Sequence, residues 1–357
     1  MKRSLTKKIA IRLRHWRKLG LREGWRDALA RLDKTDRVQF GLRGGLVRFR
    51  VRHRSGPQHI DAPADEPIVL CTVRDGLPWL LSFLAHHRAM GFRHFVVLDN
   101  GSTDGTIEAL EAEAGVTLLT SKAPYRAYEN TFKRYLCDRY GRDRWCLFVD
   151  IDEQFDFPLS DRRSLGEFVA YLEAHDYTAV VTQMLDLYSD RPLAECSIEQ
   201  EPALGALFPL CDIESIRKER YPFAAIDPIA MHFGGVRKGL FGTDNGLTKI
   251  SFFKNVAGLE PFHQWHHVKG GHIADVSAVL YHYPFIDSFA EKVAEAAASG
   301  RYGYGTTDEY VAYNRALSDG TLAISSPTGQ RLDLTDLIES GFLIAPDRYR
   351  EFGETRG

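Results

Sequence analysis

The sequence predicts an α/β fold with a mostly parallel sheet and helices on its faces. Short apolar runs with strand composition alternate with segments that have helical periodicity. Two of these runs end in acidic residues, and the carboxyl edge of an open α/β sheet is where ligands bind. Strand, helix, strand order also requires a right-handed crossover between parallel strands. We therefore expect one crevice with two acidic strand ends beside it.

The first unit contains a strand, a helix, a second strand and a second helix. These elements are predicted at residues 67–73, 78–90, 92–98 and 107–114. Pro78 stands in the first turn of its helix, where proline is tolerated, and Gly91 ends that helix. Asp99 follows the second strand directly, in a Gly/Asn/Ser-rich turn. An ordinary turn with Asp104 as a helix N-cap is the structural alternative.

The second acidic strand end is Asp150-Ile151-Asp152-Glu153, after the apolar strand predicted at residues 145–149. Alternate residues of an extended segment point the same way, so Asp150 and Asp152 should face one site. Two carboxylates this close repel each other unless a cation offsets their charge. A divalent metal that carries a diphosphate is the simplest explanation, because hard cations prefer oxygen ligands. The alternative is a solvated strand-to-loop turn.

Two motifs carry a resemblance to a known family. The octapeptide DNGSTDGT, residues 99–106, resembles the D-x-G-S-x-D-G-T turn of family 2 glycosyltransferases. The segment 150–153 resembles their metal-binding D-x-D, and its following Glu resembles a bacterial subgroup related to family 92 glycosyltransferases. The resemblance covers roughly residues 66–290. It implies the GT-A fold, which is Rossmann-like and binds nucleotide-diphospho-sugars.

The resemblance also implies roles by position. Thr72 and Asp75 would line the nucleoside pocket, and Asp99 would accept a hydrogen bond from the base. Asp150 would approach the ribose or the metal. Asp152 would bind the Mn²⁺ or Mg²⁺ that bridges the diphosphate. Such a metal neutralises the charge that develops on the leaving diphosphate.

Residues 125–138 have the pattern of an amphipathic helix. Arg126, Asn130 and Arg134 are spaced by four and share one face. In similar proteins a helix at this place carries a polar residue to the donor, so Arg126 and Asn130 are candidates for phosphate or ribose contacts. A solvated charged face is the alternative.

Carboxylates in the second half are candidates for a general base. Asp186 follows a strand predicted at residues 179–185, and Asp212 and Asp244 come later. A carboxylate can take the proton of an acceptor hydroxyl in an inverting displacement, and the resemblance implies inversion. For each of the three, a turn carboxylate is the structural alternative.

The segment 234–242, GGVRKGLFG, is glycine-rich and basic. It is predicted as a mobile loop over a diphosphate, with charge from Arg237 and Lys238 and help from Lys249. It does not match the Walker pattern, so the sequence does not favour a P-loop nucleotide site. A plain flexible loop is the alternative.

Histidines are dense near the end of the predicted domain, at His263, His266, His267, His272 and His282. They form no H-E-x-x-H motif, which argues against a zinc peptidase. GT-A enzymes often supply a further metal ligand from this region. His272, after two glycines, is the first candidate and His282 is the second.

The charge distribution divides the chain. Residues 1–54 contain 18 Lys and Arg and four Asp and Glu, a net charge of +14, whereas the whole chain carries −2. We expect a basic helical extension with linker at residues 1–62, a catalytic domain at 63–290 and a C-terminal region at 291–357 that packs on it. A basic amphipathic helix with tryptophans favours an anionic membrane surface. A helix docked on the catalytic domain, or a basic solvated extension, is the alternative.

Composition bounds the location and the class of partner. No run reaches the roughly 18 apolar residues of a membrane span, and the charged N-terminus lacks a signal-peptide core. Five cysteines without C-x-x-C pairing favour a reducing compartment. The expected location is cytoplasmic, at the inner face of a membrane. No recognised motif supports nucleic-acid binding.

These observations predict a metal-dependent glycosyltransferase. Its donor would be a nucleotide-sugar and its acceptor a glycan or lipid-linked hydroxyl, in the synthesis of a surface polysaccharide or glycolipid. A nucleotidyltransferase of similar architecture is one alternative, although residues 74–78 are a poor version of its glycine-rich activating loop. A non-catalytic module that binds glycans or membranes is the other.

Overall fold

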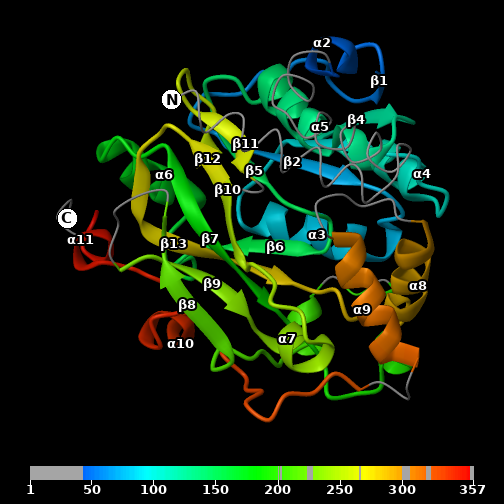
Figure 1. The fold of residues 1–357 in the computed structure, drawn as a ribbon. Coiled ribbons are helices and arrows are strands. Elements are labelled where there is room, and N and C mark those ends of the chain that lie inside the picture. Colours follow the sequence, from blue (N-terminus) through cyan, green and yellow to red (C-terminus); the bar gives the residue numbers. More distant parts are fainter. Residues whose placement is uncertain are drawn as a thin grey trace, which may run out of the picture.

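A mixed nine-stranded sheet forms the centre of the molecule (Figure 1). The structure is a computed structural model, and it describes residues 43–199, 201, 203–222, 228–264, 267–299, 306–318 and 323–353. Most of the predicted basic extension, residues 1–42, lies outside this range. None of the helices within it is long and apolar enough to cross a bilayer.

The order of the strands across the sheet differs from their order in the chain. Across the sheet they are β1 (Val51–Ser55), β4 (Val116–Ser121), β3 (Phe95–Asp99), β2 (Ile68–Val73), β5 (Trp145–Phe148), β10 (Thr248–Lys254), β7 (Ala179–Asp186), β13 (Ile273–His282) and β6 (Glu153–Asp156). The neighbours β4, β3, β2 and β5 are parallel, in a Rossmann-like order. β10 is antiparallel to both β5 and β7. The sheet is therefore mixed rather than mostly parallel.

The last two strands complete the second half of the sheet. β13 pairs in parallel with β7 and antiparallel with β6, so it is an interior strand. Two small ribbons lie outside the sheet: β8 (Ile216–Arg220) with β9 (Ala230–Gly234), and β11 (Glu260–Gln264) with β12 (His267–Lys269).

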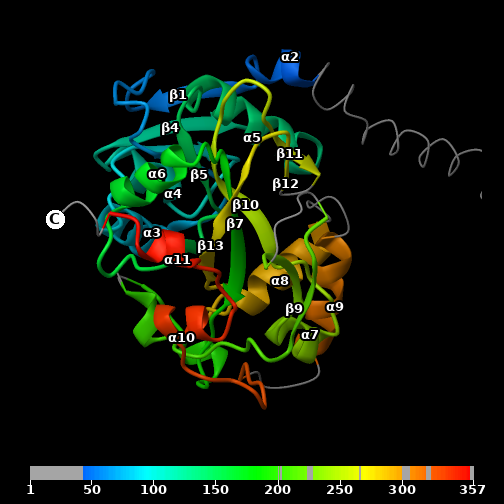
Figure 2. The same ribbon diagram turned by 90° about the vertical axis from the view of Figure 1, so that its left-hand side faces the viewer.

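Helices cover both faces of the sheet (Figures 1 and 2). They are α2 (Arg43–Val47), α3 (Leu77–Ala89), α4 (Thr106–Glu111), α5 (Tyr125–Tyr140), α6 (Leu165–Ala174), α7 (Val236–Phe241), α8 (Phe289–Ser299), α9 (Thr306–Ser318), α10 (Leu334–Glu339) and α11 (Asp347–Arg350). Short 3₁₀ turns occur at Leu193–Glu195 and Leu204–Ala206. α8 and α9 pack on each other, and α9 also contacts α7.

The alternation of β2 explains why helices pack on both faces. Val69 and Cys71 belong to the same core cluster as Phe83 of α3, whereas Ile68 and Leu70 belong to the cluster that contains Phe132 of α5. Successive side chains of a strand point to opposite faces, so a continuous apolar run is buried on both sides. Burial of each such side chain stabilises the fold by about 1.5–3 kcal/mol.

Most predicted elements of the first unit match the structure. The strands at 67–73 and 145–149 correspond to β2 and β5, and the helices at 78–90 and 125–138 correspond to α3 and α5. Two segments differ from their prediction. Residues 51–55, assigned to the extension and linker, form β1 and pair with β4. The glycine-rich segment 234–242 contains the short helix α7 instead of a loop.

Candidate functional site

A cavity of about 990 Å³ opens at the carboxyl ends of β2 and β5. Its lining includes Thr72 from the end of β2 and residues 150–153 after β5. The second half of the sheet contributes Lys249 of β10 and His282 of β13. The carboxyl edge of the parallel strands thus lines this cavity, as expected for an open α/β sheet.

The acidic segment forms a tight turn rather than an extended strand end. The Glu153 amide donates to the Asp150 carbonyl at 3.1 Å, and the Asp150 amide donates to Glu153 Oε2 at 3.1 Å. The prediction that Asp150 and Asp152 share an extended segment was therefore wrong in its local geometry. Both side chains nevertheless line the same cavity, with Asp150 38% exposed and Asp152 11%.

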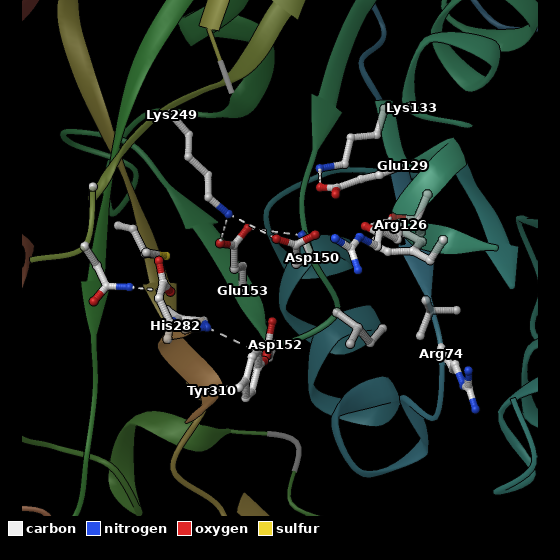
Figure 3. A pocket seen from close by; sticks show the side chains of 18 of the residues that line it. Arg74, Arg126, Glu129, Lys133, Asp150, Asp152, Glu153, Lys249, His282 and Tyr310 are labelled. Atoms are coloured by element: carbon white, nitrogen blue, oxygen red, sulfur yellow. Dashed lines mark hydrogen bonds and ion pairs between the residues drawn. The ribbon is translucent and has the colours of Figure 1, made fainter. Parts of the chain in front are cut away.

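Lys249 offsets much of the charge of this turn. Its Nζ lies 3.0 Å from Asp150 Oδ2 and 2.5 Å from Glu153 Oε1 (Figure 3). Burial raises the pKa of Glu153, opposed by Lys249. Burial alone would lower the pKa of Lys249, but the two carboxylates raise it well above its usual range. Lys249 is therefore a fixed positive charge beside Asp150 and Glu153.

His282 stands between two carboxylates. Its Nδ1 lies 2.6 Å from Asp186 Oδ1, and its Nε2 lies 3.7 Å from Asp152 Oδ2, an ion-pair distance. Burial disfavours the charged imidazole, but Asp152 and Asp186 raise the pKa of His282 to about 9. Lys292 of α8 lies 3.2 Å from the same Asp152 oxygen. Burial would raise the pKa of Asp152, but Lys292 and His282 hold it well below its usual range.

Asp186 is fully engaged behind the cavity. Its second oxygen, Oδ2, accepts a 2.7 Å hydrogen bond from Arg237 Nε of α7. Burial would raise the pKa of Asp186, but Arg237 and His282 lower it. Asp186 does not line the cavity. The predicted base is therefore a group that orients His282, because both of its oxygens already accept hydrogen bonds.

α5 forms a basic wall on the other side of the turn (Figure 3). Arg126, Glu129 and Lys133 line the cavity at spacings of three and four residues, so one helical face carries them. Lys133 is buried and pairs with Glu129 at 3.0 Å. Arg126 lies in the cavity as expected, but Asn130 is not among the lining residues. The polar face of α5 is thus rotated from the predicted one.

Asp99 and Asp75 hold the DNGSTDGT turn together. Asp99 Oδ1 accepts from the Gly101 amide at 2.8 Å and from the Ser102 amide at 3.1 Å, and Ser102 Oγ donates to its other oxygen. Asp75 Oδ1 accepts from the Thr103 amide at 2.8 Å. Neither carboxylate lines the cavity, whereas Asn100 does. The structure places their acceptor groups in the turn rather than in a nucleoside pocket.

Asp104 also bonds differently from its predicted role. The N-cap position of α4 is Gly105, with a positive φ of 94° and no side-chain cap. Asp104 instead accepts from the Leu77 amide at 3.0 Å and from the Thr106 amide at 3.0 Å. It therefore links the starts of α3 and α4.

Of the other two candidates for a general base, only Asp244 lines the cavity. Asp212 accepts hydrogen bonds from Ser215, Ser326 and Thr328 and does not line the cavity. Asp244 lines the cavity but is exposed and pairs with Arg217 and Lys238. These contacts leave neither carboxylate unengaged.

The structure separates the two preferred histidines. His272 precedes β13 at its exposed start, where its Nδ1 lies 3.1 Å from the Asp176 carbonyl, outside the cavity. His282 is the last residue of the same strand and lines the cavity. His267 also lines it, bonded to Tyr221 at 3.1 Å. His266 and the side chain of His263 lie outside the described residues.

Several lining residues were not predicted from the sequence. They are Glu129, Lys133, Asn245, Lys292, Glu309 and Tyr310. One signal was present: Lys292 is the one cation of an alanine-rich helix, α8. No comparable signal marks Asn245 or Glu309, because their place depends on how α9 packs on α7.

Asp152 and His282 are the best donors for a divalent metal. Within the described residues, no group of three or more His, Cys, Asp or Glu side chains is arranged to hold an ion. Mg²⁺ commonly takes only one or two protein carboxylates, with substrate phosphates as further ligands. A metal-binding histidine usually bonds its other ring nitrogen to a carboxylate, as Nδ1 of His282 does to Asp186. Asp152 and His282 could therefore supply two ligands of an open metal site.

The comparisons with known proteins indicate no family for this chain. No protein-family model matches it. No curated protein matches it either. Its function is therefore inferred from the chemistry of the cavity.

Proposed function

We propose that the protein is a glycosyltransferase of the GT-A type that takes a nucleotide-diphospho-sugar as donor. The observation that carries the proposal is the pairing of two opposite surfaces in one cavity. Asp150, Asp152 and His282 lie at the carboxyl edge of the sheet, and the basic residues Arg126 and Lys133 of α5 lie across from them. Such a cavity suits a diphosphate that bridges a cation and a basic helix.

The metal in this proposal is Mn²⁺ or Mg²⁺. Asp152 and His282 would hold it, with Asp150 as the neighbouring carboxylate, and Asp186 fixes the ring of His282. Because the pKa of His282 is raised to about 9, the imidazole would release a proton when it binds the metal. When bound, the metal would stabilise negative charge on the departing diphosphate. Lys292 holds the second contact to Asp152, so this lysine must release or share that oxygen when a metal binds.

The residues around the diphosphate would do the electrostatic work. Arg126 and Lys133 line the wall where the phosphates would lie, and the single charge of Lys249 offsets part of the negative charge of Asp150 and Glu153. Preorganised charges in a partly buried site stabilise developing charge without reorganisation. The acceptor hydroxyl would form a new bond to the anomeric carbon while the bond from that carbon to the diphosphate breaks, and the hydroxyl proton leaves to a base or water. Inversion remains part of the proposal.

Thermal unfolding tests the donor. We would measure the melting temperature of the full chain with UDP, GDP, CMP and dTDP, each with and without Mn²⁺. A ligand that binds the native state raises the free energy of unfolding, by about 2.7 kcal/mol when its concentration is a hundredfold above Kd. The melting temperature rises as a result. We expect one nucleotide to give a Mn²⁺-dependent shift that Asp152→Asn abolishes.

A matched variant controls for lost charge. Asp190 is an exposed carboxylate shortly after β7, so Asp190→Asn should leave the shift intact. The absence of any nucleotide shift in the wild type would contradict the proposal. Incubation with the nucleotide-sugar separates the remaining alternatives, because a transferase releases nucleoside diphosphate. A nucleotidyltransferase would instead release pyrophosphate from a nucleoside triphosphate.

A further inference from the structure

A second wall of the cavity is built from α7, α9 and the residues before β10. Its lining includes Arg237 of α7, Asn245, and Glu309, Tyr310 and Tyr313 of α9. It lies beyond His282, behind which Arg237 bonds to Asp186. The nucleotide proposal assigns no role to this wall.

Two buried polar atoms on this wall have no hydrogen-bond partner among the described residues. They are Oδ1 of Asn245 and Nη2 of Arg237. Asn245 is only 7% exposed and Arg237 only 9%. A buried polar group without a partner destabilises the folded state. Native proteins keep few such groups, and here both belong to residues that line a large cavity.

The orientation of the Asn245 amide follows from its neighbours. Its Nδ2 lies 2.7 Å from Glu309 Oε2 and 3.3 Å from the Tyr313 hydroxyl. An ionised carboxylate only accepts hydrogen bonds, so the amide nitrogen must be the atom that faces Glu309. Oδ1 is therefore held as an acceptor that points away from Glu309.

Glu309 adds a second acceptor to the same wall. Asn245 donates to Oε2, so the Asn245 bond does not occupy Oε1. Burial raises the pKa of Glu309, and nearby Arg237 opposes that rise. The wall thus holds an amide oxygen, a carboxylate oxygen and a guanidinium N–H group in one part of the cavity lining. The amide oxygen and the guanidinium nitrogen are covered in this structure, so a ligand must move neighbouring side chains to reach them.

Aromatic rings complete the wall. Phe233 and Tyr310 line the cavity and are half-buried, and Tyr310 packs edge-on against Tyr313 at 5.7 Å between ring centroids. Figure 3 shows Tyr310 beside Asp152 and His282. Flat apolar rings next to a few fixed polar groups are typical of sites that bind small ligands. The C–H faces of a sugar ring would pack on such aromatic surfaces.

Charge decides which part of a substrate this wall fits. Arg237 is already paired with Asp186 at 2.7 Å, and Glu309 is a carboxylate. A phosphate here would meet Glu309 without an uncommitted cation from the wall's described lining residues to offset it. The α5 side of the cavity suits the phosphates better, because Lys122 before the helix and Arg126 and Lys133 on it outnumber the one carboxylate there, Glu129. A neutral ligand with several hydroxyls suits the α7–α9 wall.

We propose that the wall formed by Arg237, Asn245, Glu309 and Tyr310 is the acceptor subsite and that it binds a neutral sugar ring. Asn245 Oδ1 and Glu309 Oε1 accept hydrogen bonds from two sugar hydroxyls, and Arg237 Nη2 donates one to a sugar oxygen. The inference rests on the proposed glycosyl transfer. It names the acceptor as an uncharged glycan terminus rather than a phosphorylated group.

Ligand-observed NMR on the full-length chain tests the subsite. The probes are the methyl glycosides of glucose, galactose and mannose, measured by saturation transfer with the nucleotide bound. We expect at least one glycoside to bind the wild type. Asn245→Ala and Glu309→Gln should each weaken its binding by about tenfold, as the loss of about 1.4 kcal/mol implies. Asp308→Asn, an exposed carboxylate next to Glu309 on α9, should change nothing.

The nucleotide shift separates the possible failures. Each variant should keep the nucleotide-dependent rise in melting temperature, which also shows that it is folded. If no nucleotide binds the wild type, the proposed function fails. If a nucleotide binds but no glycoside does, or if both variants bind the glycoside as the wild type does, only the acceptor subsite is overturned.

Discussion

His282 and Asp186 form the most constrained pair in the site. Asp186 holds His282 at 2.6 Å on one oxygen and Arg237 at 2.7 Å on the other. The pair joins α7, β7 and β13 behind the proposed metal position. Removing one partner of a buried charge pair usually costs about 3–5 kcal/mol, because the other charge stays buried.

Asp186→Asn therefore should lower both stability and activity. The amide keeps the shape of the side chain but leaves Arg237 without its counter-charge and His282 free to turn. We expect a loss of about 3 kcal/mol in the free energy of unfolding. We also expect a lower kcat for transfer and weaker Mn²⁺-dependent nucleotide binding, because Asp186 orients the His282 ring that would hold the metal. Denaturant unfolding and initial rates measure the two effects. Equal behaviour of Asp186→Asn and Asp190→Asn would contradict the role.

His232 gives a prediction about pH. It is buried on β9, its ring centroid lies 5.0 Å from that of Phe342, and burial lowers its pKa to about 3. The unfolded chain, with an ordinary pKa near 6.5, binds this proton more readily, so stability is lost as pH falls below about 6.5. His232→Phe removes the titrating group and the unpartnered Nδ1.

The variant should therefore resist acid better than the wild type. From pH 7 to pH 5 the wild type should lose about 2 kcal/mol of unfolding free energy relative to His232→Phe. Urea unfolding of both proteins at the two pH values measures this difference. If the stability of the two proteins changed with pH in the same way, the pKa of His232 would not be lowered by folding, which would contradict the prediction.

At the scale of elements, Gly56 fixes the edge strand β1. It has a positive φ of 79°, and a Cβ added there would lie 2.1 Å from the Val116 carbonyl oxygen. Only glycine allows the chain to turn this close to β4. β1 extends the parallel half of the sheet with an antiparallel edge.

Gly56→Ala should release β1 from β4. We expect faster hydrogen exchange in residues 51–55 and a loss of about 1–3 kcal/mol in unfolding free energy, from steric contact and backbone strain. Gly44→Ala on α2 is the matched control, because a Cβ there meets nothing within 4 Å. Unchanged exchange in β1 of the Gly56 variant would mean that the turn adapts.

The predictable elements are those with local signals. The periodicity of residues 78–90 predicts a helix, and the apolar run at 67–73 predicts a strand. Both signals lie within the segment itself. The choice between His272 and His282 is different, since it depends on the register of β13 against β7 and β6. A shift by one residue would turn His282 to the other face. The spacing of residues in the sequence does not predict the register of β13 against β7 and β6.

Motif recognition was also limited in a physical way. The DNGSTDGT pattern predicts a turn correctly. Within that turn, however, the Asp99 carboxylate accepts hydrogen bonds from the Gly101 and Ser102 amides. The D-x-D motif points to the cavity, whereas Lys249, Lys292 and Glu309 enter it from elements about 100 or more residues later. Such long-range contacts follow from packing rather than from local pattern.

At the scale of the whole molecule, charge is concentrated at one end of the chain. The described part of the basic segment exposes Arg48, Phe49 and Arg50, and Phe49 is 71% exposed. Exposed aromatic and basic side chains together favour an anionic lipid surface, at about 1 kcal/mol for each basic residue near it. We propose that this end contacts the membrane where a lipid-linked acceptor would lie.

Vesicle sedimentation of the full chain tests this contact. We expect binding to phosphatidylglycerol vesicles and not to phosphatidylcholine vesicles, with a loss in high salt. Charge reversal by Arg48→Glu with Arg50→Glu should weaken binding at least tenfold. The same reversal at the exposed Arg139 and Arg142, near the end of α5, should weaken it less. Equal effects of the two pairs would indicate attraction by net charge alone.

The interior position of β13 has a consequence for biosynthesis. A ribosome delivers β6 and β7 before β13, yet β13 must enter between them, and His282 on it pairs with Glu153 on one side and Asp186 on the other. Long-range pairing of this kind is slow, and nascent domains fold from the N-terminal end. The parallel strands β4, β3, β2 and β5 can pair early, whereas β6 stays unpaired until β13 has been synthesised. Translation must therefore pass the last residue of β13 before the nascent chain can form its acidic cavity.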